Sequence, residues 1–243
     1  MTINTIQPDW PINGVVNAFT STRQGGVSHA SFDSLNIAMH VDDNPADVLV
    51  NRSRLPNYQN INWLNQTHSN KAVELTANSV RVYDADASFS HQRGVVCAVM
   101  TADCLPVLLA DPEAGTVAAV HAGWRGLADG VIENTVKAMT GGNDSDNNNI
   151  YAWLGPAIGA NYFEVGEDVR RAFSDPEHCY FQHTVKSSKY LADIYQIARY
   201  RLFNLGIKRV FGGEYCTYSQ SDQFYSYRRD GQTGRMVSCI WFD

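Results

Sequence analysis

Three short apolar runs follow one another in the middle of this chain, and they constrain its fold more than any other feature. They are Val95–Met100, Leu105–Ala110 and Thr116–Val120. Each has the length of a strand and is bounded by turn formers such as the Asp111-Pro112 pair. Strands that are apolar along their whole length are covered on both faces. The runs therefore predict strands in the middle of a layered fold.

The segments on either side of these runs carry a mixture of helix and strand signals. A helix is expected to start at Pro45, with Asn44 as its N-cap, and to end by Pro56. Further helices are expected at about 127–139, 166–173 and 190–205, strands at 14–20, 72–75, 151–154, 210–212 and 236–242, and a polar loop at 83–87.

The size and composition of the chain predict one domain over residues 1–243. The chain is 44% hydrophobic and 18% charged, as in a globular protein with a sizeable core. No apolar run approaches the roughly 20 residues that span a bilayer, and the first residues lack the basic and apolar regions of a secretory signal. We therefore expect no association with a membrane.

The cysteine content indicates the cellular compartment, and the net charge indicates which classes of partner the chain can bind. The five cysteines are odd in number and scattered, which does not suit a disulfide framework, so we expect a reducing cytoplasm. The net charge of −6 comes from interspersed charges, without the basic stripe that binding to nucleic acid needs. An anionic small substrate is compatible with this charge, because a few local arginines suffice to bind it.

Two reactive side chains stand at the ends of the central runs. Cys104 follows Thr101-Ala102-Asp103 at a strand junction, and His121 ends the third run before a glycine-containing turn. Strand ends that lead into such turns are where a rigid scaffold presents chemical groups. His68 lies in a polar stretch before another expected strand. Taken singly, residues of these types more often serve packing or hydrogen bonding.

Three arrangements would give these residues a chemical role. Cys104 and His121 could form a nucleophile pair, in which the imidazole lowers the pKa of the thiol. Together with His68 they could hold a catalytic zinc ion with a fourth position open to water. Copper chemistry is the third, but a laccase-type cluster uses His-X-His pairs, and none of the seven histidines is so placed. Spacing does not choose between the first two, because the partners meet only in the fold.

Several longer motifs are spread over almost the whole chain. They are STRQGGVS at 21–28, SLNIAMHVDDNP at 34–45, NR at 51–52, QTH at 66–68, MTADCLPVLL at 100–109, HAGWRG at 121–126, LGPAIG at 154–159 and YRRDGQTGRM at 227–236. In these segments the chain resembles the bacterial YfiH family, formerly labelled multicopper polyphenol oxidases or laccase-domain proteins. TADCLPV and HAGWRG, in this order and at this separation, are a highly specific pair. Asp42 departs from the pattern at a turn where the family often has glycine.

The resemblance implies a fold and a metal site. The implied fold is a single α/β (α+β) domain, a four-layer αββα sandwich of mixed β-sheets similar to the catalytic domain of cytotoxic necrotizing factors. The resemblance also implies that His68, Cys104 and His121 are both the metal ligands and the catalytic residues. Zinc is the implied metal, with copper as the alternative.

The resemblance further implies an enzyme of purine metabolism. The expected activity is a purine nucleoside phosphorylase acting on adenosine, inosine, guanosine or methylthioadenosine with phosphate, with adenosine deaminase as a side activity. The runner-up is a Cys–His amidase acting on peptidoglycan precursors, and a copper polyphenol oxidase is a third alternative. We expect small-molecule partners only, with neither nucleic acid nor membrane, and a monomer or homodimer.

Phosphorolysis requires a site for an anion, and guanidinium groups bind phosphate through paired hydrogen bonds. At most two of the five candidate arginines are expected to bind it, since arginines in such segments more often form structural ion pairs. Arg125 is expected just before the helix at 127–139, whose N-terminal N–H groups could share the anion. The expected substrate-binding residues are Arg23, Asn36, Arg125, Arg228, Arg229 and Arg235.

Overall fold

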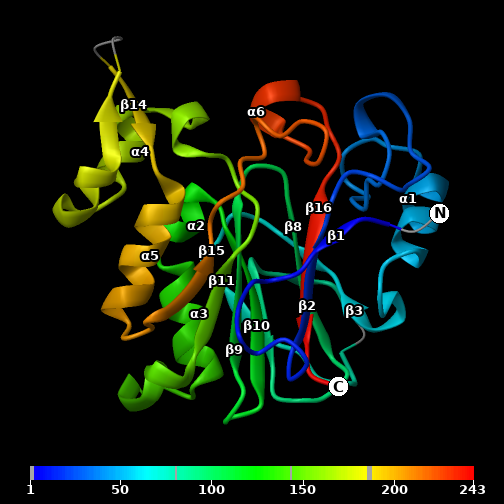
Figure 1. Ribbon diagram of the computed structural model, residues 1–243, viewed down its shortest axis with the longest axis horizontal. Coiled ribbons are helices and arrows are strands. Elements are labelled where there is room, and N and C mark those ends of the chain that lie inside the picture. Colours follow the sequence, from blue (N-terminus) through cyan, green and yellow to red (C-terminus); the bar gives the residue numbers. More distant parts are fainter. Residues whose placement is uncertain (1–2, 80, 143, 185–187) are drawn as a thin grey trace.

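The computed structural model describes residues 3–79, 81–142, 144–184 and 188–243. Two large mixed β-sheets pack face to face, and helical layers cover their outer faces (Figure 1). This is the expected four-layer αββα arrangement, so the fold prediction is confirmed. No helix in the described part of the chain combines the length and the apolar character that crossing a bilayer requires.

One of the two large sheets has six strands in the order β15-β11-β9-β10-β7-β5. Its central strands β9 and β10 are antiparallel neighbours, whereas the edge strands β15 and β5 run parallel to the strands beside them. The strands are β5 (Ala72–Glu74), β7 (Ala87–Ser90), β9 (Leu105–Asp111), β10 (Thr116–Ala122), β11 (Tyr151–Leu154) and β15 (Arg209–Gly212).

The other large sheet has five strands in the order β1-β2-β16-β8-β3. Strand β16 comes last in the sequence but lies in the middle of this sheet, antiparallel to both β2 and β8. The strands are β1 (Thr5–Ile6), β2 (Asn17–Ser21), β3 (Ile61–Asn62), β8 (Val96–Thr101) and β16 (Met236–Trp241).

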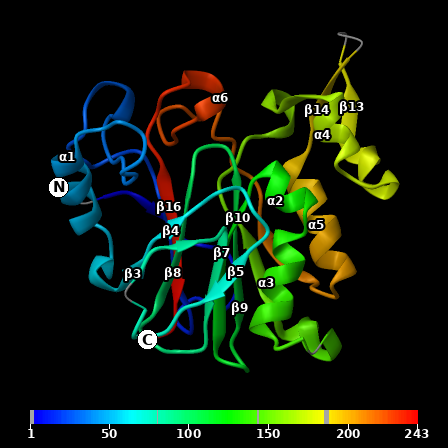
Figure 2. The ribbon, with the colours of Figure 1, turned by 180° about the vertical axis from the view of Figure 1, so that it is seen from behind.

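The three central apolar runs form β8, β9 and β10, as predicted. Because side chains alternate across a strand, β8 sends Cys97 and Val99 into the core between the sheets, which they share with Leu108 and Val117 of the six-stranded sheet. Helices α2, α3 and α5 cover the outer face of the six-stranded sheet, and Figure 2 shows α3 beside β5 and β7. The segment around α1 covers the outer face of the five-stranded sheet.

The remaining elements are short. The helix predicted at Pro45 is confirmed, because the Asn44 side chain accepts a hydrogen bond from the Ala46 N–H at its start. The helices are α1 (Pro45–Ser53), α2 (Trp124–Ala128), α3 (Val131–Met139), α4 (Glu167–Arg171), α5 (Ile194–Asn204) and α6 (Tyr227–Asp230). The two small sheets contain β4 (Leu64–Asn65) with β6 (Tyr83–Asp84), and β12 (Glu164–Gly166) with β14 (Lys189–Ala192) and β13 (Phe181–His183).

Two of the expected helices are wrong in part. The single helix at 127–139 is two helices, α2 and α3, because Gly130 has a φ of 86° and breaks the helical path between them. The helix expected from Tyr190 starts only at Ile194, where the Asp193 side chain caps it. The residues before the cap pair with β12 and β13 as a strand instead.

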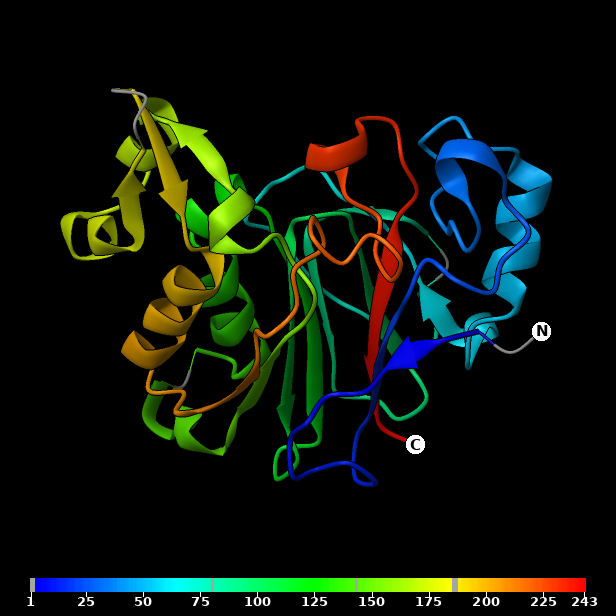
Figure 3. The same ribbon diagram turned by 45° about the horizontal axis from the view of Figure 1, so that its top comes forward.

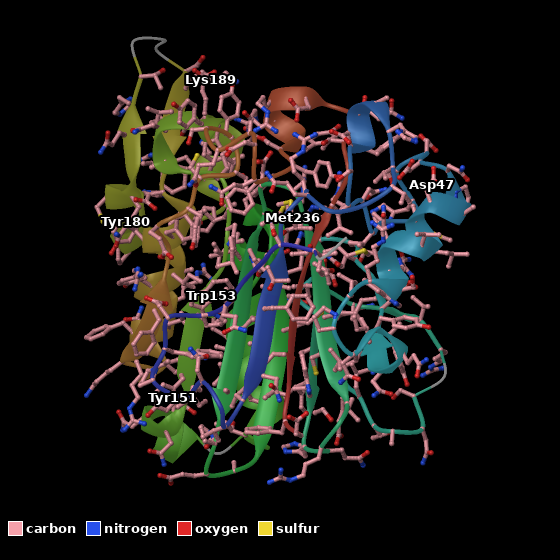
Figure 4. All side chains as sticks on the ribbon, turned by 45° about the vertical axis from the view of Figure 1, so that its right-hand side comes forward. Asp47, Tyr151, Trp153, Tyr180, Lys189 and Met236 are labelled. Atoms are coloured by element: carbon pink, nitrogen blue, oxygen red, sulfur yellow. The ribbon has the colours of Figure 1, made fainter. Side chains whose placement is uncertain are left out.

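The ends of the sheets nearest α6 carry the functional groups. At this end the turn after β8 takes the chain from the five-stranded sheet to β9 of the six-stranded sheet. Helix α6 lies over this end, as Figure 3 shows. Met236, the first residue of β16, lies here, whereas Tyr151, the first residue of β11, lies at the opposite end (Figure 4).

Candidate metal centre

The structure brings together the side chains of His68, Cys104 and His121. Their potential ligand atoms all lie within 4.8 Å of one another. The Cys104 Sγ is 3.9 Å from His68 Nε2, and the two imidazole rings meet edge to face with centroids 4.8 Å apart. His68 is exposed, Cys104 is half-buried and His121 is buried, so the group opens toward solvent on one side.

Different elements supply the three residues, and two of the backbones are strained. His121 lies near the end of β10, Cys104 directly precedes β9, and His68 lies in the loop after β4. His68 has a φ of 60° and Asp103, just before Cys104, a φ of 89°. Residues other than glycine adopt this left-handed backbone conformation at an energetic cost, and such strain concentrates at functional sites.

Asp86 fixes the orientation of two of these residues. Its Oδ1 is 2.8 Å from His121 Nδ1, and its two carboxylate oxygens accept hydrogen bonds from the backbone N–H groups of Thr67, His68 and Ser69. Burial opposes ionisation of Asp86, but the hydrogen bonds from His121 and Ser69 outweigh it and hold the pKa well below its usual range. Asp86 is therefore a buried carboxylate that orients the imidazole of His121 and holds the backbone of His68.

The sequence prediction missed Asp86, because it lies in the expected polar loop at 83–87. The structure instead has strands at both ends of this segment, with Asp86 fully buried between Ala85 and Ala87. An acidic residue between two alanines, just before the short buried strand β7, is the one local signal. Its partners are distant in sequence, so the role is visible only in the fold.

Charges within the group act on the thiol and the imidazole. Burial raises the pKa of Cys104, but the facing His121 and His68 outweigh it and lower that pKa to about 6. Burial lowers the pKa of His121, but the Cys104 thiolate and Asp86 outweigh it and raise that pKa to about 9. At neutral pH the cysteine is therefore a thiolate, the form that binds a metal or acts as a nucleophile.

The group fits one transition-metal ion. One thiolate and two imidazoles are a donor set that suits catalytic zinc, and Asp86 holds the His121 Nδ1 so that Nε2 is available as a ligand. Gly123 leaves the necessary space, since a Cβ there would lie 2.9 Å from His68 Cδ2 and 3.1 Å from Cys104 Sγ. Within the described residues, this is the one group of three His, Cys or acidic side chains placed to share an ion.

Two cavities meet at this group. They share His68, Ala102, Cys104, Arg125 and Tyr227 as lining residues. The first, which we call the polar cavity, has a volume of about 440 Å³ and is also lined by His40, Gln66, Met100, Thr101, His121 and Arg235. The second, which we call the aromatic cavity, has a volume of about 230 Å³ and is also lined by Asp103, Trp124, Ile158, Phe163, Ile194 and Arg228.

The predicted arginines divide between these cavities and structural networks. Arg125 lines both cavities, Arg235 lines the polar cavity and Arg228 lines the aromatic cavity. Arg125 lies inside α2, so the prediction that it precedes the helix is wrong.

The other expected substrate-binding residues line neither cavity. Arg23 donates to the carbonyls of Asp33 and Ser221. Arg229 donates to three backbone carbonyls and pairs with Asp230. Asn36 is buried, and its Oδ1 accepts the backbone N–H of Arg235, so it acts on the polar cavity through that residue.

The chain is similar to known proteins over nearly its full length. It is 50% identical to "Purine nucleoside phosphorylase YfiH" of Shigella flexneri, over 97% of this chain and 98% of the relative. It is 44% identical to "Purine nucleoside phosphorylase" of Haemophilus influenzae, over 99% of this chain and 100% of the relative. The crystal structure of Neisseria meningitidis protein NMB0706 superposes with a TM-score of 0.90 at 45% identity, covering 100% of both chains. The family model described as multi-copper polyphenol oxidoreductase laccase matches residues 17–243. The chain therefore belongs to the YfiH family, the laccase-domain family that this model describes.

Proposed function

We propose that this protein is a zinc-dependent purine nucleoside phosphorylase that also deaminates adenosine. The observation that carries the proposal is the meeting of the metal-ligand group with a cationic and an aromatic cavity. The names of relatives at 44–50% identity support the phosphorylase. The proposed substrates are adenosine, inosine, guanosine and methylthioadenosine, each with phosphate.

In phosphorolysis, an oxygen of phosphate forms a bond to C1′ of the ribose while the bond from C1′ to the purine nitrogen breaks. The electron pair of that bond leaves with the purine, which then takes up a proton. A site for this reaction must hold an anion beside the positive charge that develops on the sugar. Arg125 suits the task, because its guanidinium forms no hydrogen bond or ion pair with a described residue and stacks on Trp124.

His68, Cys104 and His121 would hold the zinc ion. When bound, it would supply a Lewis acid at the wall common to both cavities, and deamination needs such a group to activate water. Asp86 holds Nδ1 of His121, so that a metal would displace the proton from Nε2, and the low pKa of Cys104 keeps the thiolate available. The cysteines within the described residues are all free, which agrees with our proposal of a cytoplasmic enzyme.

A cysteine amidase is the second candidate, and one observation favours it. Cys104, His121 and Asp86 are arranged as a nucleophile, a base and a carboxylate that orients the base. A peptidoglycan precursor would be the substrate class. This reading needs Cys104 to be free, whereas the phosphorylase reading needs it to be bound to metal.

A product screen separates these functions. Purified protein is incubated with adenosine, with and without phosphate, and products are identified by mass spectrometry. We expect adenine and ribose 1-phosphate only when phosphate is present, and inosine in both reactions. Cys104→Ala is the matched control and should give neither product. Absence of both products from the metal-loaded wild-type protein would exclude the proposal and favour the amidase.

A further inference from the structure

We infer that the two cavities divide the substrates, with phosphate bound in the polar cavity between Arg125 and Arg235, and the purine bound in the aromatic cavity. The inference rests on the proposed phosphorylase function and goes beyond it by assigning a direction to the reaction. Phosphate would approach C1′ from the polar cavity, and the purine would leave toward the aromatic cavity.

The polar cavity has the charge that an anion requires. His40, Arg125 and Arg235 line it, and no carboxylate of the described residues does. Burial lowers the pKa of His40, and the positive charges of Arg235 and Arg52 lower it further. Cys104 and Asp103 are negative groups that act on Arg235, whereas Arg125 has no ion-pair partner among the described residues, so a phosphate would bind between one partly compensated and one uncompensated guanidinium.

One nitrogen of the Arg235 guanidinium is hydrogen-bonded to the backbone, and the other two are available to a ligand. Its Nη1 donates to the carbonyls of Thr233 and Gly234, at 2.8 and 3.0 Å. Its Nε and Nη2 form no hydrogen bond with a described residue, and the side chain forms no ion pair with a described carboxylate. A guanidinium fixed by one nitrogen and free at two others can bind an anion with little loss of conformational entropy.

A buried polar network explains why the 34–45 motif belongs to this cavity. The Asn36 Oδ1 accepts the backbone N–H of Arg235 at 3.0 Å, and its Nδ2 donates to Asp43 at 2.8 Å. Asn36 also bonds both ways with the backbone of Ala38, two residues before His40. The network therefore positions Arg235 and the segment that carries His40, which come from distant parts of the chain, and Asn36 is a positioning residue.

The aromatic cavity has the opposite character. Trp124, Phe163 and Tyr227 provide flat aromatic surfaces, which suit a purine ring. Asp103 places a carboxylate here, which disfavours phosphate. Arg228 also lines this cavity, but its Nη1 already donates to the Glu164 carbonyl at 2.7 Å and is therefore less available to a phosphate.

The wall that the two cavities share determines how phosphate, ribose and purine would lie relative to one another. His68, Cys104, Arg125 and Tyr227 line both cavities, so a ribose that joins the two sites must pass this wall. Its C1′ would then lie beside the metal ligands, with phosphate on one side and purine on the other. That is the arrangement needed for displacement with the incoming and leaving groups on opposite faces of C1′.

Steady-state kinetics with adenosine and inorganic phosphate test the division. We expect Arg235→Gln to raise the KM for phosphate about ten- to a hundredfold, the usual effect of losing a charge-assisted contact, and to change the KM for adenosine less than about threefold. Phe163→Ala should do the reverse. Arg235→Lys should restore part of the phosphate affinity, because it keeps the charge without the paired donors. Arg209→Gln, at an exposed arginine that lines neither cavity, is the matched control.

The results that would overturn the inference differ from those that would overturn the proposed function. If Arg235→Gln raises the KM for adenosine and leaves that for phosphate unchanged, the division is wrong although the enzyme is a phosphorylase. If wild-type protein forms no ribose 1-phosphate, the proposed function fails. Melting temperatures of the variants show whether each is folded, and binding of inorganic phosphate to each folded variant, measured by calorimetry, gives a second readout that does not depend on turnover.

Discussion

The hydrogen bond between Asp86 and His121 decides which nitrogen of His121 is available to a metal. Asp86 accepts the proton on Nδ1, so Nε2 is the nitrogen left for a metal, which would displace the proton that the raised pKa keeps there. The same carboxylate accepts three backbone N–H groups from residues 67–69, which fixes the loop that carries His68. One buried side chain therefore prepares two of the three ligands before any ion binds.

Replacing Asp86 should weaken metal binding without removing a ligand. We expect Asp86→Asn to reduce zinc affinity about ten- to a hundredfold, the usual effect of removing a hydrogen-bonding partner of a metal-binding histidine. Competition with a chelator of known affinity measures this change. Asp84→Asn, two residues away and exposed, should keep wild-type affinity. Equal affinities for the two variants would contradict the role of Asp86.

The lowered pKa of Cys104 should be visible in its reactivity. In metal-free protein, the rate of alkylation by iodoacetamide should stay high as the pH falls to about 6 and decline below it, because only the thiolate reacts. An ordinary thiol loses reactivity already below a pH of about 8.5. Zinc-loaded protein should be protected over the whole range in which the metal stays bound. Rapid labelling of Cys104 in zinc-loaded protein would instead favour the amidase.

At the scale of elements, the glycine that precedes helix α2 lets the helix start close to the metal ligands. Gly123 precedes the helix with a φ of −64°, which any residue can adopt, so glycine is needed there for space and not for conformation. The space is that between the helix and the ligands, since a Cβ would approach both His68 and Cys104. Gly130, at the other end of α2, shows the opposite case, because its φ is positive and its nearest neighbour is the tip of Glu133.

Alanine at these two glycines should give opposite results. Gly123→Ala should lower the zinc content, measured by elemental analysis, with little change in stability of the metal-free protein. Gly130→Ala should leave the zinc content unchanged and lower the free energy of unfolding by about 1–2 kcal/mol, the cost of a left-handed residue with a Cβ. Urea denaturation measures that cost. Full zinc content in Gly123→Ala would show that the ligands have room to move.

The elements that the sequence predicts well are those whose signal is local. Strands β8, β9 and β10 are buried on both faces, so their continuous apolar runs mark them within two residues at each end. The helical periodicity of Leu127, Val131 and Val136 continues across Gly130 and conceals the break there. The pattern after Tyr190 suits a helix or a strand, and only pairing with β12 and β13 decides for the strand.

In the candidate site, too, the sequence marks some residues and leaves others unmarked. Residue type and motif single out His68, Cys104 and His121, since thiolate and imidazole are the groups that bind zinc or act as nucleophile and base. Asp86 escapes because a lone aspartate in a polar stretch is common. Arg23 and Arg229 are basic residues in matching motifs, but their guanidinium groups bind backbone carbonyls. A carbonyl oxygen and a phosphate oxygen accept hydrogen bonds from the same guanidinium donors. Sequence therefore does not distinguish an arginine that binds the backbone from one that binds phosphate.

On the scale of the whole molecule, a bound metal would join three segments that are distant in the sequence. Cys104 comes from the turn between the two large sheets, His121 from β10 of the six-stranded sheet and His68 from the loop after β4. An ion on these ligands binds the folded chain and not the unfolded one, because the ligands meet only after folding.

Metal should therefore raise the melting temperature. At a free zinc concentration 100 times the Kd, binding adds about 2.7 kcal/mol to the free energy of unfolding. Differential scanning fluorimetry with zinc and with a chelator measures the shift. Cys104→Ala should show little of it, and a variant of an unrelated cysteine, Cys179→Ala, should show all of it. A shift that survives in Cys104→Ala would place the ion elsewhere.

The central place of β16 has a consequence for how the chain is made. The hydroxyls of Thr20 and Ser238 lie 2.6 Å apart across 218 residues of sequence, because β16, which is made after β2 and β8, lies between them. While a ribosome is still working toward residue 236, β2 and β8 have no strand between them, and each presents an unpaired edge of the kind that aggregates. The five-stranded sheet closes only once β16 has left the exit tunnel. The chain therefore presents both edges until β16 has emerged, and holding by a chaperone matters most over that interval.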